Sequence, residues 1–94
     1  MIEQRRHLRY RMETTQLAQA KFEGTPGKRD HRPVLIANLS YSGCNLIAIG
    51  QPDEVTPGDD MVLEFDADDA VELEIVRVER LTPRAIRIGC RFLD

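Results

Sequence analysis

The chain has 94 residues, of which 41% are hydrophobic and 31% are charged, and its net charge is −3. A chain of this length supports one hydrophobic core, which excludes a two-domain organisation. No apolar run approaches the roughly 18 residues of a transmembrane helix, and no apolar segment of a signal peptide follows the first basic residues. We therefore expect one soluble, cytoplasmic domain over residues 1–94.

Charge is distributed unevenly along this domain. Residues 1–11 carry four arginines and Glu3, a net charge of +3, so the whole-chain value of −3 leaves −6 for residues 12–94. An acidic body repels nucleic acid at long range, whereas a local basic segment suits a small anion bound at one place. The charge pattern thus argues against a general DNA- or RNA-binding protein.

Turn signals rich in Gly, Pro, Asp and Ser divide the chain into short, strand-sized pieces. The six predicted strands cover residues 16–23, 31–37, 44–49, 61–66, 71–80 and 85–93. This spacing is typical of an antiparallel sandwich or small barrel, here formed by residues 12–94. Residues 3–20 have a competing helical composition, but their apolar residues are too sparse for a stripe, so we interpret residues 1–11 as a flexible basic arm.

Alternation is clearest in the last predicted strand, where the apolar positions are expected to face the core. One face would carry Ile86, Ile88, Cys90 and Phe92, and the other Arg87, Gly89 and Arg91. In residues 71–80 the alternation slips after Ile75, and Val76 and Val78 take the apolar positions. This slip predicts a β-bulge near Ile75 and Val76.

The two cysteines, Cys44 and Cys90, lie in apolar sequence and are expected to be buried thiols in a reducing compartment. With His7 and His31 they do not have the spacing of a zinc site. The acidic residues 66–69 lack the glycine and distal glutamate of a calcium-binding loop. We expect neither a metal site nor a cofactor.

A polar motif follows the second predicted strand. If the chain is still extended there, Asn38 and Ser40 point to the same face, and Gly43 permits a positive φ or a close backbone approach. An amide oxygen and a hydroxyl side by side suit the N1–H and N2–H₂ donors of guanine. The complementary partner is arginine, which binds guanine O6 and N7 or two phosphate oxygens bidentately.

The motifs together resemble the PilZ domains, which bind the bacterial second messenger cyclic di-GMP. That family carries Arg-x-x-x-Arg near its start and Asp/Asn-x-Ser-x-x-Gly some thirty residues later. Here these are RRHLR at residues 5–9 and NLSYSG at residues 38–43. The sequences PGD at 57–59, VRV at 76–78 and IGCRFL at 88–93 are also similar to PilZ features.

The resemblance implies a fold: a six-stranded antiparallel β-barrel, split-barrel-like, with a flexible basic N-terminal arm. Because the sequence ends at Asp94, we expect little or no C-terminal helix. Some relatives that bind a stacked ligand dimer have another arginine where this chain has Gln4, so the resemblance leaves open whether one or two ligand molecules bind.

The resemblance also implies a site. Its expected members are Arg5, Arg6, Arg9, Asn38, Ser40 and Gly43. Arg5 and Arg9 would grip phosphates and guanine edges, with Arg6 contributing. Asn38 and Ser40 would hold a guanine from the barrel surface, and Gly43 would keep the approach open.

The expected function is that of a receptor that catalyses nothing, because Ser40 and Ser42 lack a His and acid arrangement. Ligand-induced ordering of the arm would signal to a downstream effector protein. We expect a monomer or weak homodimer with no nucleic-acid or membrane partner. The alternatives are a degenerate PilZ-like protein interaction module that binds no nucleotide, and weak RNA binding by the arm. For Arg77, Arg87 and Arg91 we favour pairing with neighbouring Glu residues over ligand contact.

Overall fold

The computed structural model describes residues 13–22, 31–65 and 69–93, and it contains six strands and one short 3₁₀ helix in chain order. The elements are β1 (Leu17–Phe22), β2 (His31–Leu39), β3 (Gly43–Ile49), η1 (Pro52–Glu54), β4 (Asp60–Glu64), β5 (Ala70–Thr82) and β6 (Ala85–Phe92). All six predicted strands are confirmed, with ends that differ by at most two residues.

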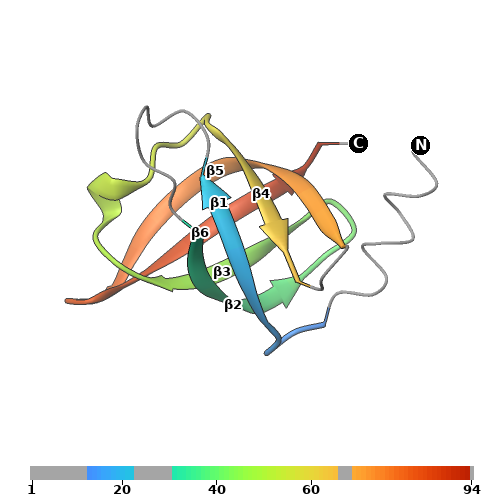
Figure 1. The fold of residues 1–94 in the computed structure, drawn as a ribbon. Coiled ribbons are helices and arrows are strands. Elements are labelled where there is room, and N and C mark those ends of the chain that lie inside the picture. The colour runs from blue at the N-terminus through green and yellow to red at the C-terminus, as the bar shows by residue number, and fades with distance from the viewer. Residues whose placement is uncertain (1–12, 23–30, 66–68, 94) are drawn as a thin grey trace.

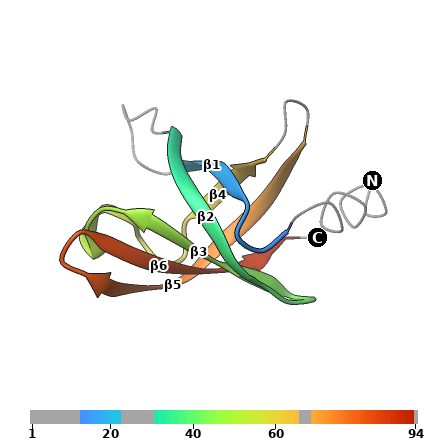
Figure 2. The same ribbon diagram turned by 90° about the horizontal axis from the view of Figure 1, so that it is seen from below.

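The strands form a closed antiparallel barrel in the order β1-β2-β3-β6-β5-β4 (Figure 1). Pairing of β1 with β4 closes it, and Ala20 lies opposite Leu63 there. Closure gives every described strand a neighbour on both sides, although the second half of β5, after Val76, pairs with β6 alone. In Figure 2 the β2–β3 turn and the tip of the β5–β6 hairpin lie at opposite ends of the barrel. The predicted barrel class is therefore confirmed.

The core lies inside the barrel and is built from alternate residues of every strand. The largest fully buried side chains are Ile36, Leu46, Met61, Leu63, Leu73, Ile75, Ile86, Ile88 and Val34. The predicted inward face of β6 is confirmed in full, from Ile86 to Phe92. In β1, Ala18 and Ala20 point inward, so the competing helix over residues 3–20 is wrong for residues 17–20, and residues 1–12 lie outside the described part.

The predicted bulge in β5 is confirmed, but one residue in it behaves differently. Ile75 pairs with Cys90 and Arg77 pairs with Gly89, so Val76 is the extra residue. Its side chain is 54% exposed, and the expectation that it joins the apolar face is wrong. An inserted residue restarts the alternation after itself. Arg77 consequently points outward and Val78 packs against the core.

A second bulge, which the sequence analysis did not predict, lies in β2. Ile36 pairs with Leu46 and Asn38 pairs with Asn45, so Ala37 is the extra residue. Val34 and Ile36 are buried, and strict alternation would turn Asn38 into the core as well. The bulge instead leaves Asn38 exposed on the outer face. Within the described ranges, no helix has the length and apolar character needed to cross a bilayer.

Candidate functional site

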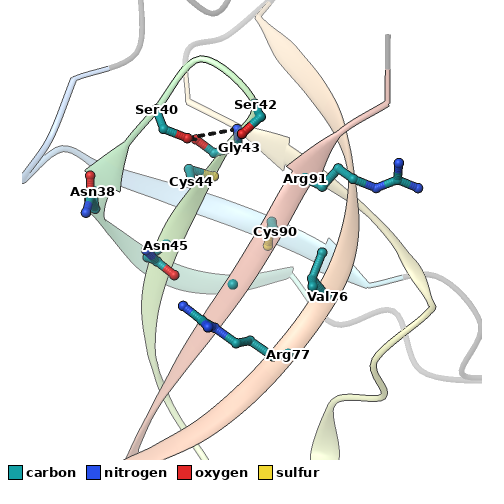
Figure 3. Close-up of a pocket in the computed structure, with 11 residues that line it drawn as sticks. Asn38, Ser40, Ser42, Gly43, Cys44, Asn45, Val76, Arg77, Cys90 and Arg91 are labelled. Atoms are coloured by element: carbon teal, nitrogen blue, oxygen red, sulfur yellow. Dashed lines mark hydrogen bonds between the residues drawn. The ribbon is translucent and has the colours of Figure 1, made fainter.

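A pocket of about 300 Å³ lies on the outer face of β2, β3, β6 and β5, close to the β2–β3 turn (Figure 3). Its lining residues are Asn38, Ser40, Ser42, Gly43, Cys44, Asn45, Val76, Arg77, Gly89, Cys90 and Arg91. Three predicted site residues, Asn38, Ser40 and Gly43, are therefore brought together in one pocket. The other lining residues are Ser42 in the β2–β3 turn, two residues of β3, and residues of β5 and β6 more than thirty positions later in the chain.

A single row of residues across four strands forms the lower part of this pocket. Asn38 on β2 pairs with Asn45 on β3, Asn45 pairs with Gly89 on β6, and Gly89 pairs with Arg77 on β5. The two bulges supply the ends of the row, because each turns a polar side chain outward that strict alternation would have buried. The row thus places two carboxamides and one guanidinium on the same surface.

The upper part of the pocket is the turn between β2 and β3. The backbone N–H of Ser40 donates to the Gly43 carbonyl at 2.9 Å, and the Gly43 N–H donates to Ser40 Oγ at 3.2 Å (Figure 3). Ser40 Oγ also lies 3.2 Å from the Gly43 carbonyl oxygen and can donate to it. The hydroxyl therefore closes the turn and keeps a lone pair that can accept a further hydrogen bond.

Gly43 has the close backbone approach that was one of its two predicted roles. A Cβ at this position would lie 2.0 Å from the Cys90 carbonyl oxygen. The other predicted role is wrong, because the described glycines with positive φ are Gly50 and Gly58. Gly43 is required by the tight contact between β3 and β6 and by the turn that presents Ser40.

Two arginines line the pocket, and both contact a carboxylate. Arg77 Nε lies 3.4 Å from Glu79 Oε1, and Arg91 Nε donates to Glu74 Oε1 at 2.8 Å. The predicted pairing with neighbouring Glu residues is confirmed for these two arginines. It was incomplete, however, because both side chains also border the pocket.

Asn45, Gly89 and Arg77 were not among the site residues predicted from the sequence. A signal for Arg77 was present, because the slip that predicted the bulge also predicts that the residue after Val76 turns outward. Asn45 is a polar residue within an otherwise apolar strand, which is the usual sign of an outward position. Which of these residues lie side by side depends on the register between the strands, and a single strand's sequence does not show that register.

The two cysteines lie beneath the pocket as partners across β3 and β6. Both are buried free thiols, as predicted. A hydrogen bond to Cys44, together with burial, raises the pKa of Cys90 above its usual value. The thiol therefore stays protonated and is a poor nucleophile. Among the described residues no three metal-ligating side chains come together, and His31 lies beside Glu64, at 3.3 Å.

Three predicted site residues, Arg5, Arg6 and Arg9, lie outside the described part of the chain. Their approach to the pocket stays a prediction. The described surface already supplies hydrogen-bond acceptors at Asn38 and Ser40 and a guanidinium at Arg77. This is a set of groups that can hold a planar, polar ring with both donor and acceptor edges.

Comparison with known proteins agrees with this arrangement. Neither the curated proteins nor the solved structures include a match to the chain. The family model described as "PilZ domain" matches residues 3–94, which is nearly the whole sequence. The match covers all six strands of the closed barrel and the Asn-x-Ser-x-x-Gly motif that borders the outer pocket. The chain therefore belongs to the PilZ domain family.

Proposed function

We propose that this protein is a receptor for cyclic di-GMP. PilZ domains are in general a cyclic di-GMP-binding family of receptor and adaptor modules. The observation that carries the proposal for this chain is that Asn38 and Ser40 border the same pocket, with a guanidinium on its opposite side. The pairing of an amide oxygen and a hydroxyl with arginine matches the two edges of guanine.

The chemistry of recognition follows from the donors and acceptors of the base. Guanine N1–H and N2–H₂ donate toward the Asn38 amide oxygen and Ser40 Oγ, while O6 and N7 accept from arginine. The two phosphates carry a charge of about −2 and are bound by Arg5 and Arg9, with Arg6 beside them. The net charge of +3 on residues 1–11 supplies this complement on an otherwise acidic chain.

The size of the pocket limits how much of the ligand it encloses. Its volume of about 300 Å³ is at the lower end of the range for small-molecule sites, roughly 300 to 1,000 Å³. It therefore receives one guanine nucleotide half of the dinucleotide, and the remainder lies at the rim. The rim is where the arginines of residues 5–9 would close over the ligand.

Signalling in this proposal comes from ligand-induced ordering of residues 1–11. The ligand selects the arrangement in which Arg5 and Arg9 lie against Asn38 and Ser40, which changes the shape and charge of the surface. A downstream effector protein then binds the two states differently. No catalytic step is part of the proposal.

Titration calorimetry with cyclic di-GMP, and with GTP and cyclic GMP as competitors, tests this function directly. Arg9→Ala removes one partner of a hydrogen-bonded charge pair, which costs about 2 to 5 kcal/mol, so binding should fall below detection. Arg11→Ala removes the same charge two residues away, outside the motif, and should bind within about threefold of the wild type. Circular dichroism checks that both variants are folded.

Binding of Arg9→Ala that equals the wild type would show that the site assignment is wrong. A wild-type protein that binds none of the three nucleotides would refute the receptor function itself.

A second candidate function is favoured by one specific observation on the outer surface. Leu17, Leu35 and Ile47 are register partners across β1, β2 and β3; Leu17 is 73% exposed, and Leu35 and Ile47 are half-buried. A contiguous apolar row with an exposed end is a feature that a protein partner could cover. A degenerate PilZ module that binds a protein and no nucleotide would keep partner binding when Arg5 and Arg9 are both replaced by Lys, whereas a bidentate nucleotide site would fail.

A further inference from the structure

The two arginines of the pocket point in different directions, although both lie on its border. In Figure 3 the guanidinium of Arg77 extends toward Asn45, while that of Arg91 extends away from the pocket. Each belongs to the outward face of its strand, and their side chains are similarly exposed, 64% for Arg77 and 61% for Arg91. Exposure therefore does not distinguish the two arginines. The residues that each one contacts do.

Arg77 can lie over the pocket because Gly89, its register partner on β6, has no side chain. A Cβ at Gly89 would lie 3.0 Å from Arg77 Cγ, 3.2 Å from Arg77 Nε and 3.3 Å from Asn45 Oδ1. The arginine therefore crosses β6 through the space that glycine leaves. Glu79 Oε1, at 3.4 Å from Nε, contacts the guanidinium on the side of β5.

Arg91 is held in the opposite direction by its partner across the strands. Glu74 on β5 is the register partner of Arg91 on β6. Both Nε and Nη2 of Arg91 donate to the same Glu74 oxygen, and the Glu74 side chain is only 28% exposed. Two donors on one half-buried carboxylate fix the arginine toward β5.

We propose that Arg77 is an additional ligand-binding residue of this pocket, contributed by the barrel itself, and that Glu74 keeps Arg91 out of the same role. The planar fork of Arg77 beside the Asn45 carboxamide suits a group that presents two acceptors, such as guanine O6 and N7 or two phosphate oxygens. The identity of the ligand rests on the proposed function, whereas the difference between the arginines rests on the barrel alone.

Matched substitutions separate the two arginines. Arg77→Gln and Arg91→Gln remove the same charge from the same pocket, and cyclic di-GMP affinity is measured by titration calorimetry. Loss of a hydrogen bond to a charged group predicts a weakening of about 10- to 100-fold for Arg77→Gln. Arg91→Gln should change affinity by less than about threefold.

Two further variants test the reasons for the difference. Gly89→Ala keeps every charge but places a methyl group against Arg77, and it should weaken binding about 3- to 10-fold in a folded protein. Glu74→Gln releases Arg91, and the affinity gained should disappear when Arg91→Gln is added. Glu64→Gln on β4, whose carboxylate lies beside His31 and away from the pocket, is the charge control.

Equal losses for Arg77→Gln and Arg91→Gln would overturn the proposal, as would Arg77→Gln binding like the wild type. If the wild type does not bind cyclic di-GMP, the proposed function fails, and the inference is tested with pyrophosphate by ¹H–¹⁵N spectra of the arginine Nε–H groups. A shift of the Arg77 signal with a fixed Arg91 signal supports it. Shifts of both, or of Arg91 alone, or of neither contradict it.

Discussion

The substitution Gly43→Ala adds one methyl group at a place where the backbones of β3 and β6 approach each other closely. Its Cβ would lie 2.0 Å from the Cys90 carbonyl oxygen and 3.1 Å from the Arg91 Cα. Both neighbours are backbone atoms of a paired strand, so they cannot rotate away as a side chain could. The two strands must therefore separate locally by roughly 1.5 Å to reach an ordinary contact distance.

The cost of that separation can be worked from the contacts nearby. The Phe92 N–H donates to the Ser42 carbonyl at 2.9 Å, and the Ser40 N–H donates to the Gly43 carbonyl at the same distance. Each of the two weakened hydrogen bonds costs about 0.5 to 1.5 kcal/mol, and overpacking adds about 1 to 3 kcal/mol. We expect the free energy of unfolding to fall by about 2 to 6 kcal/mol.

Urea unfolding and thermal unfolding followed by circular dichroism measure this change. For a domain of this size the expected loss lowers the Tm by roughly 10 to 30 °C. Gly89→Ala is the matched control, because it makes the same substitution on the same pair of strands. Its nearest neighbours are side-chain atoms of Arg77, at 3.0 and 3.2 Å, which can move. Its effect on stability should stay within about 1 kcal/mol.

A Gly43→Ala protein as stable as the wild type would refute the reasoning about close backbone approach. So would an equal loss in Gly43→Ala and Gly89→Ala, because the argument depends on what each added methyl group meets.

Three further predictions concern the barrel. Thr15 has a φ of 64°, which is strained for a β-branched residue, so Thr15→Asn should raise the free energy of unfolding by about 0.5 to 1 kcal/mol in urea titration; a decrease would contradict this. Ile75→Ala should cost about 2 to 5 kcal/mol and Val76→Ala less than about 0.5, and comparable losses would show that the bulge is misplaced. Because the pKa of Cys90 is raised in the folded state, the unfolded chain loses that proton first, and stability should fall as pH rises above about 8.5, by up to about 1.4 kcal/mol per pH unit. In urea unfolding between pH 7 and 10, the free energy of unfolding should fall less steeply with pH in Cys90→Ala than in the wild type. Equal slopes in the two proteins would contradict a raised pKa of Cys90 in the folded state.

Much of the barrel could be predicted from the sequence because strand alternation is a local property. The apolar positions of residues 85–93 predicted the inward face of β6, and the slip after Ile75 predicted the bulge in β5. The bulge in β2 was missed, although a similar slip is present there: Asn38 stands where alternation would place a buried residue, and the next residue, Leu39, packs against the core. The predicted strand ended at residue 37, before this slip. The effect of the bulge on Asn38 depends on the pairing with β3.

Some residues of the candidate site could likewise be predicted from the sequence, and others needed the structure. The motif at residues 38–43 marked Asn38, Ser40 and Gly43, which the structure brings to one pocket. The role of Gly43 needed the structure, since a positive φ and a close approach are equally open to a glycine in a sequence. The contribution of Arg5, Arg6 and Arg9 stays a prediction.

The sequence by itself determined the number of strands, the inward residues of most of them and the family, because each depends on neighbours along the chain. Only the tertiary structure decided that Asn45, Gly89 and Arg77 stand in one row and that Arg91 turns toward Glu74. Strand register sets these contacts, and a shift of one residue would move every side chain to the other face. That register is fixed when the whole barrel closes around its core.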